Sequence, residues 1–174
     1  AGHLTLDRGN NTRAVAAPRS DNVVRIHSQG YTPLCVSLDR LSPDAAEQNA
    51  SEALVRGIAE RLTQTGRSVG GFDAVTASDV PKGSGLSSSA AFSILVCTML
   101  SELYNGGQIP PVEQALASKY AENKHFGKPS GLMDQLACAV GGFIAIDFEK
   151  PEEPQIEKID CDLSALGYAI CIVN

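Results

Sequence analysis

The order of apolar patterns along the chain predicts an α+β fold. Strand-like alternation fills much of the first forty residues and returns after position 142, whereas helical spacing dominates between positions 51 and 140. With 174 residues, of which 43% are hydrophobic, the chain can bury a sizeable core, so wholesale disorder is excluded. The length favours a single domain.

Arg13–Pro18 is small and β-tolerant, and several other predicted strands alternate between apolar and polar residues. Val24 and Ile26 alternate with polar neighbours, and Leu34, Val36 and Leu38 continue that pattern. On this basis we predict strands over Arg13–Pro18, Asn22–Ser28, Leu34–Leu38, Phe72–Val80, Phe143–Phe148, Gln155–Ile159 and Tyr168–Val173.

The predicted helices differ in how much of their surface is apolar. Apolar residues between Ser51 and Thr65 recur at intervals of three and four, and Gly66 ends the run. A second helix, Ser87–Leu103, is apolar almost all round and therefore belongs in the middle of the domain. Two further helices follow, from Pro110 to about Lys124 and over Asp134–Val140, with the loop His125–Gly131 between them.

The net charge and the cysteines of the chain indicate which partners and which cellular compartment to expect. The chain has 14 Lys and Arg against 20 Asp and Glu, a formal charge of −6, so we expect no nucleic-acid or acidic-membrane partner. No apolar run reaches the roughly 18 residues that span a bilayer, and the first residues lack a signal-peptide layout. The five cysteines are odd in number and widely spaced, which favours buried, reduced thiols in the cytoplasm.

One glycine- and serine-rich loop stands out. The segment Pro81–Ala90, which reads PKGSGLSSSA, joins a predicted strand to the most apolar helix. Glycines let backbone N–H groups approach a ligand, and the start of a helix favours an anion. The loop is neither a P-loop, because Lys82 precedes both glycines, nor a dinucleotide fingerprint, whose third glycine would be Ser88. The pattern alone leaves open a flexible turn with serine caps or a polyphosphate-binding loop.

Two carboxylates form the second candidate feature. Glu122 lies near the end of one predicted helix and Asp134 near the start of the next. The ordinary interpretation is a surface charge and a helix cap. The functional one is that one carboxylate holds Mg²⁺ while the other accepts a proton from a hydroxyl nucleophile, as phosphoryl transfer requires.

Together, the two segments resemble the GHMP small-molecule kinases. Pro81–Ala90 is similar to the second motif of that family, and its triple serine is typical of the galactokinase branch. Glu122–Gln135, which reads ENKHFGKPSGLMDQ, is similar to the galactokinase segment that ends in Gly-Ile-Met-Asp-Gln. Shorter matches at Ala53–Ile58, Gly141–Phe143 and Ile146–Asp147 extend the resemblance over nearly all of the chain.

The resemblance implies a fold and a reaction. The fold is that of the GHMP kinase amino-terminal domain, an α+β arrangement with a left-handed βαβ unit and a mixed sheet packed on helices. Residues 1–174 would form a single domain of this kind. The reaction is the ATP- and Mg²⁺-dependent phosphorylation of galactose at its anomeric hydroxyl, which gives galactose 1-phosphate and ADP.

The resemblance also implies roles for single residues. Asp134 would be the catalytic base, and it would line the sugar pocket together with Ser130 and the backbone of Gly131. Ser89 and Glu122 would hold Mg²⁺. The ATP phosphates would be wrapped by Gly83, Ser84, Gly85, Leu86, Ser87, Ser88 and Ser89.

The chain departs from the family pattern in several places. Ser93 stands where galactokinases often have Glu, and Ser130 replaces the cysteine common before the Gly-Leu-Met-Asp-Gln run. Ala1–His3 is similar to the tail of the family's first motif, which binds the sugar and contributes an arginine. The late glycine-rich third motif has no counterpart here. We therefore expect an amino-terminal domain that lacks its first motif and the carboxy-terminal domain, and that turns over only with those segments.

Two alternatives stay open at this point. A GHMP kinase for N-acetylgalactosamine, arabinose, another sugar or a mevalonate-like alcohol would differ mainly in the missing first motif. A regulator that binds galactose and ATP without turnover is of another class. Asp134, Glu122 and Ser89 argue against a regulator, because a pure sensor needs no base. The sequence predicts no oligomeric state.

Overall fold

The computed structural model describes residues 4–7, 12–79, 87–151, 153–163 and 165–168. Its helices and strands follow one another in the order β1 (Leu4–Asp7), β2 (Thr12–Pro18), β3 (Val23–Ser28), β4 (Leu34–Ser37), the short 3₁₀ helix η1 (Ala45–Glu47), α1 (Ser51–Gln64), β5 (Phe72–Ser78), α2 (Ser88–Asn105), α3 (Pro111–Tyr120), the π-helix η2 (Ala121–Phe126), α4 (Met133–Val140), β6 (Phe143–Asp147) and β7 (Gln155–Ile159).

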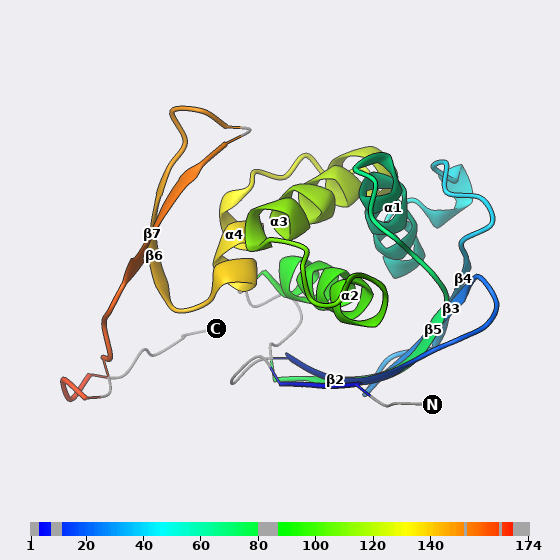
Figure 1. The fold of residues 1–174 in the computed structure, drawn as a ribbon, viewed down its shortest axis with the longest axis horizontal. Helices are drawn as coiled ribbons and strands as arrows, with labels where there is room; N and C mark the ends of the chain where they lie inside the picture. Colours follow the sequence, from blue (N-terminus) through cyan, green and yellow to red (C-terminus); the bar gives the residue numbers. More distant parts are fainter. Residues whose placement is uncertain (1–3, 8–11, 80–86, 152, 164, 169–174) are drawn as a thin grey trace.

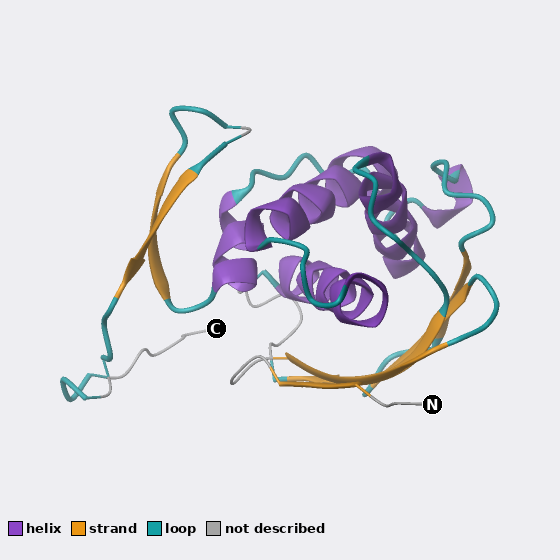
Figure 2. Ribbon diagram, in the orientation of Figure 1, coloured by secondary structure: helices purple, strands orange, loops and turns teal. Residues whose placement is uncertain are grey.

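Five strands form a mixed sheet in the order β1-β2-β5-β3-β4. The neighbours β3 and β5 run parallel, with α1 between them in sequence, and the other pairs are antiparallel. The helices gather over one face of this sheet (Figures 1 and 2). Strand alternation sets that face, since Phe72, Ala74 and Thr76 are buried while Asp73 and Val75 are exposed. The predicted α+β fold with a mixed sheet packed on helices is confirmed, and the left-handed sense of the βαβ unit stays a prediction.

Helix α2 is the centre of the helical layer. Every residue from Ser93 to Ser101 is buried, as its nearly continuous apolar sequence predicts. The helix packs against β2, α1, α3 and α4, so its position is fixed from several sides. Burial also raises the pKa of the Cys97 thiol within it, which keeps that sulfur protonated.

Sequence reasoning was wrong in several details. It missed β1, and it placed a loop from His125, whereas the chain continues as a π-helix to Phe126. It expected buried cysteines, but Cys35 is exposed, because Leu34 and Val36 take the inward positions of β4. The predicted strand Tyr168–Val173 lies outside the described residues except for Tyr168, which is exposed and not in a strand.

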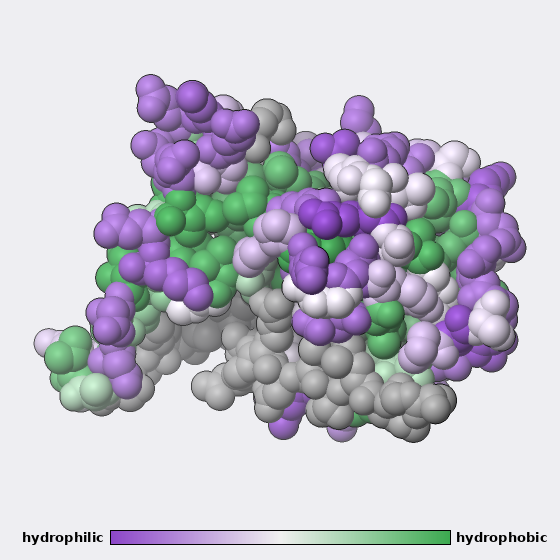
Figure 3. All heavy atoms as spheres, viewed as in Figure 1, coloured by the Kyte–Doolittle hydropathy of each residue, from purple (hydrophilic) through white to green (hydrophobic). Residues whose placement is uncertain are grey.

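The hairpin of β6 and β7 forms a separate two-stranded sheet. Ile144, Ile146 and Ile156 pack against the buried cluster that contains Leu132 and Leu136. Figure 3 shows apolar surface on this side of the molecule. Large exposed side chains on the hairpin and beyond it are Phe143, Phe148, Ile159, Leu166 and Tyr168. Among the described helices, none is long and apolar enough to cross a membrane.

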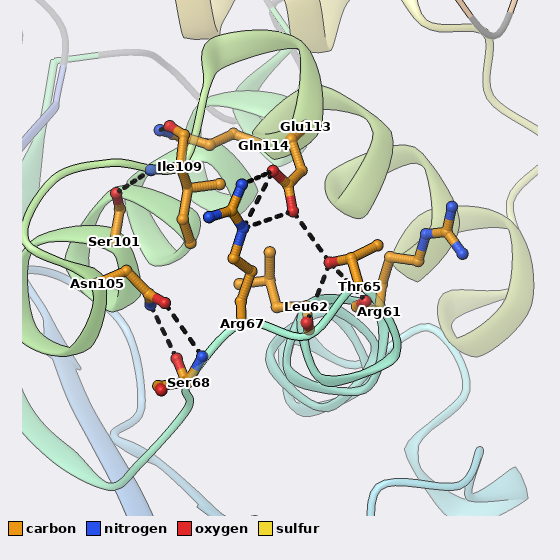
Figure 4. Close-up of polar contacts among 10 residues, drawn as sticks. All are labelled: Arg61, Leu62, Thr65, Arg67, Ser68, Ser101, Asn105, Ile109, Glu113 and Gln114. Atoms are coloured by element: carbon orange, nitrogen blue, oxygen red, sulfur yellow. Dashed lines mark hydrogen bonds and ion pairs between the residues drawn. The ribbon is translucent and has the colours of Figure 1, made fainter.

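The connection between α1 and β5 is tied to the helical layer by polar contacts (Figure 4). Arg67 donates from Nη2 to Glu113 Oε2 at 2.5 Å and from Nε to Glu113 Oε1 at 2.9 Å. Thr65 Oγ1 donates to the same carboxylate at 3.0 Å. The hydrogen bond from Arg67 lowers the pKa of Glu113, against an opposing contribution from burial.

The lowered pKa of Glu113 predicts a specific acid sensitivity. A carboxylate with a depressed folded-state pKa stabilises the fold above its ordinary value of 4.5, and this stabilisation is lost as the pH falls through the folded-state value. We expect Glu113→Gln to be less stable than wild type at neutral pH, with the difference shrinking as the pH falls below 4.5. Thermal unfolding midpoints across that range measure it. Exposed Glu102, which forms no ion pair with another described residue, gives the control Glu102→Gln. An unchanged difference at low pH would contradict the assignment.

Candidate active site

A cavity of about 250 Å³ lies where α2 begins, beside the π-helix and the loop that enters α4. It brings together most of the predicted site residues that the structure describes, along with others. Its lining is Ser89, Ala90, Glu122, Lys128, Ser130, Gly131, Met133, Asp134 and Gln135. A larger hollow of about 590 Å³ lies on the outward face of the sheet, and none of the predicted site residues lines it. The smaller cavity is therefore the candidate site.

The start of α2 supplies one wall of the cavity. Ser88 and Ser89 are the first two residues of the helix and are half-buried, and Ser89 with Ala90 lines the cavity. The unpaired N–H groups of a first helical turn favour negative charge there. Ser87 precedes the helix and is described below. The predicted phosphate ligands Gly83, Ser84, Gly85 and Leu86 lie outside the described residues.

Glu122 is a buried carboxylate rather than a surface charge. The residue is 1% exposed, and its Oε2 accepts a hydrogen bond from Gln135 Nε2 at 2.9 Å. Its Oε1 is buried too and has no donor among the described residues. A buried carboxylate oxygen without a donor is costly, and a cation is one partner that would offset this cost. Oxygen ligands of this kind suit Mg²⁺, which takes one or two protein oxygens together with phosphate oxygens and water.

The π-helix that carries Glu122 packs closely against α1. His125 Nε2 contacts Glu60 Oε2 at 2.7 Å, and Tyr120 Oη donates to the same oxygen at 2.8 Å. Gly57 on α1 makes this close approach possible, because a Cβ there would lie 2.7 Å from the Cα of Ala121. The π-helix is thus held by α1 through His125 and by α4 through Glu122. Single-turn π-helices occur frequently at functional sites.

Asp134 is not a helix cap. It is the second residue of α4, the cap position is Leu132, and no side chain caps this helix. Asp134 is half-buried, lines the cavity, and accepts a hydrogen bond at Oδ2 from Ser87 Oγ at 2.5 Å. Burial raises the pKa of the nearby Cys138 thiol, and the negative charge of Asp134 raises it further by a smaller amount. That thiol therefore stays protonated at neutral pH.

The loop before α4 is fixed from the π-helix. Asn123 Oδ1 accepts from the backbone N–H of Ser130 at 2.8 Å and from its hydroxyl at 3.2 Å. These contacts hold Ser130 and Gly131 at the cavity wall, where the sequence predicted a sugar pocket. The sequence assigned no role to Ala90, Lys128, Met133 and Gln135. All four lie within the two segments that carried the resemblance, which was the signal available for them.

Comparisons with known proteins agree with this architecture. The pattern of the GHMP kinases N terminal domain matches residues 53–142, which is more than half of the chain. The chain therefore belongs to the GHMP kinase family. Within that family, a galactokinase from Clostridium tetani (strain Massachusetts / E88) is 34% identical over 123 residues, which cover 71% of this chain and 31% of that protein. The chain thus spans about a third of this relative's length.

Solved structures of other kinases share the fold. The crystal structure of Lactococcus lactis galactokinase complexed with galactose aligns with a TM-score of 0.73 at 25% identity, over 87% of this chain and 40% of that one. A D-glycero-D-manno-heptose 1-phosphate kinase from Bacteriodes thetaiotaomicron aligns with a TM-score of 0.69 at 18% identity, over 91% of this chain and 51% of that one. The second likeness is one of fold alone.

The close contact of α1 with the π-helix predicts that a methyl group added at Gly57 destabilises the fold. In Gly57→Ala the added Cβ would lie 2.7 Å from Ala121 Cα and 2.8 Å from His125 Cδ2, and backbone cannot give way as a flexible side chain can. We expect a loss of about 1–3 kcal/mol in the free energy of unfolding, the usual cost of overpacking. Urea unfolding measures it.

Gly131→Ala is the matched control for that experiment, because a Cβ there meets no described atom within 4 Å and its backbone is not left-handed. We expect this control to stay within about 0.5 kcal/mol of wild type. Equal stabilities of the two variants would show that α1 and the π-helix are not in close contact.

Proposed function

We propose that the protein to which this chain belongs phosphorylates galactose at its anomeric hydroxyl, with ATP and Mg²⁺ as co-substrate and cofactor. The observation that carries the proposal is that one cavity is lined by Ser89, Glu122, Ser130, Gly131 and Asp134 together. These residues come from three segments of the chain. The family resemblance implies a role for each of them in the same reaction. Membership of a kinase family and the likeness to galactokinases support the choice of reaction.

Glu122 and Ser89 are the proposed Mg²⁺ ligands. The Oε1 atom of Glu122, without a donor among the described residues, fits a cation, and the hydroxyl of Ser89 adds a neutral oxygen at the same cavity. When bound, Mg²⁺ neutralises negative charge on the phosphate oxygens. Gln135 keeps the other oxygen of Glu122 occupied, which fixes the orientation of the carboxylate. The start of α2 adds partial positive charge for the phosphates.

Asp134 is the proposed catalytic base. One of its oxygens is held by Ser87, so its second oxygen can accept the proton of the anomeric hydroxyl. The sugar oxygen then bonds to the γ-phosphorus of ATP, and the bond between that phosphorus and the oxygen bridging to the β-phosphate breaks. Galactose 1-phosphate and ADP leave, and the proton passes from Asp134 to water. Ser130 and Gly131 are proposed to contact the sugar.

Galactose is proposed as the substrate because the relative with 34% identity is a galactokinase. We further propose that residues 1–174 form most of an amino-terminal domain and that the complete protein supplies the rest of the site. This fits a chain that spans 31% of that relative. The cytoplasm is the proposed location, since the reaction uses ATP.

Replacing Asp134 with Asn tests the base. Asp134→Asn preserves shape and removes the ability to accept a proton, so we expect kcat in the full-length protein to fall by about 10²–10⁴. The measurement is galactose-dependent ADP release at saturating Mg·ATP. Exposed Asp39, outside the cavity, gives the control Asp39→Asn, whose rate we expect to equal that of wild type. A rate for Asp134→Asn within about threefold of wild type would exclude Asp134 as the base.

A further inference from the structure

Ser87 has a backbone conformation that non-glycine residues seldom adopt. Its φ is 56° and its ψ is 44°, in the left-handed region, and among the described residues only Asn49, with a φ of 65°, shares a positive φ without being glycine. This conformation is unfavourable for a residue with a Cβ and free of penalty for glycine. An observed strain of this kind at a candidate site points to a function for the side chain.

The hydroxyl of Ser87 does not serve the helix that Ser87 precedes. A serine at this position usually accepts a hydrogen bond from the first helical turn, in an extended backbone conformation. Here no side-chain cap bond forms, although the Ser87 carbonyl accepts from the N–H of Ala91 at 3.0 Å. The hydroxyl instead donates to Asp134 Oδ2 at 2.5 Å, across 47 positions of sequence. The Ser87 backbone is therefore bonded to the first turn of α2, while its side chain is bonded to Asp134 on α4.

We propose that Ser87 is a positioning residue for Asp134, which rests on the proposed role of Asp134 as catalytic base. Its hydroxyl fixes Oδ2 and so determines where Oδ1 meets the substrate hydroxyl. A short hydrogen bond from a hydroxyl to a carboxylate is strong and directional. Because Ser87 directly precedes α2, the same contact ties the position of the base to the start of that helix. The base and the phosphate site then keep one geometry, which an in-line transfer requires.

This role differs in its consequences from the ATP contact that the sequence predicted for Ser87. Loss of a phosphate ligand weakens ATP binding and raises the KM for ATP. Loss of a contact that orients the base leaves ground-state binding alone and lowers kcat. Two variants separate the hydroxyl from the backbone. Ser87→Gly removes the hydroxyl and relieves the left-handed conformation, whereas Ser87→Ala removes the hydroxyl and keeps the unfavourable conformation.

The test measures steady-state kinetics and thermal unfolding of the full-length protein. We expect kcat to fall about tenfold or more in both variants, the size of one hydrogen bond to a charged group, with the KM for ATP within about twofold of wild type. We expect the unfolding midpoint of Ser87→Gly to be no lower than that of wild type, so that misfolding does not explain its lost rate. Exposed Asn49 gives the control Asn49→Gly, which relieves the same conformation away from the cavity and should leave kcat unchanged.

A double-mutant cycle adds a readout that a merely structural role would not move. In an Asp134→Ala background, Ser87→Gly should cost no further activity, because the group it positions is gone. Additive losses would overturn the inference, as would a wild-type kcat in Ser87→Gly or a loss seen only in the KM for ATP. Wild-type protein that folds but shows no turnover would overturn the proposed function itself, and the inference with it. The two failures are therefore told apart by the wild-type assay alone.

Discussion

The buried carboxylate of Glu122 is the constraint on which the site depends. A carboxylate that is 1% exposed is stable only when donors or cations surround it. Gln135 donates to one of its oxygens, and no described residue donates to the other. The fold must therefore keep α4 against the π-helix, and it retains a buried acceptor suited to a cation. Buried ionic groups are weak evidence for stability, since apolar side chains of similar size often stabilise a fold as well or better.

The remainder of the helical layer keeps that carboxylate in place. Helix α2 is buried along its centre and presents only its first turn to the cavity. The π-helix is held by α1 through the contact of His125 with Glu60, and Asn123 fixes the loop that leads into α4. Packing of apolar helices thus positions a few polar atoms, and Ser87 links the first turn of α2 to Asp134 directly. This division between an apolar scaffold and a small set of placed polar groups is what a binding cavity requires.

Sequence patterns predicted most of the fold, and the family resemblance named five of the residues that line the cavity. Alternation located β3 to β5 because one face of the sheet is buried, and the spacing of Leu54, Val55 and Ile58 located α1 for the same reason. The π-helix could not be predicted, because one extra residue in a turn is set by packing against Gly57 and not by the composition of the turn. The burial of Glu122 and the bond from Ser87 to Asp134 are likewise long-range contacts, which periodicity does not contain.

The most direct measurement is galactose-dependent ADP release by the full-length protein with Mg·ATP, together with phosphorus NMR of the sugar product. We expect ADP to appear with galactose, the phosphate to be on the anomeric oxygen, and release to stop when Mg²⁺ is removed by a chelator. A folded full-length protein that binds ATP yet releases no ADP with galactose would contradict the proposed reaction. So would a phosphate on any other oxygen of the sugar.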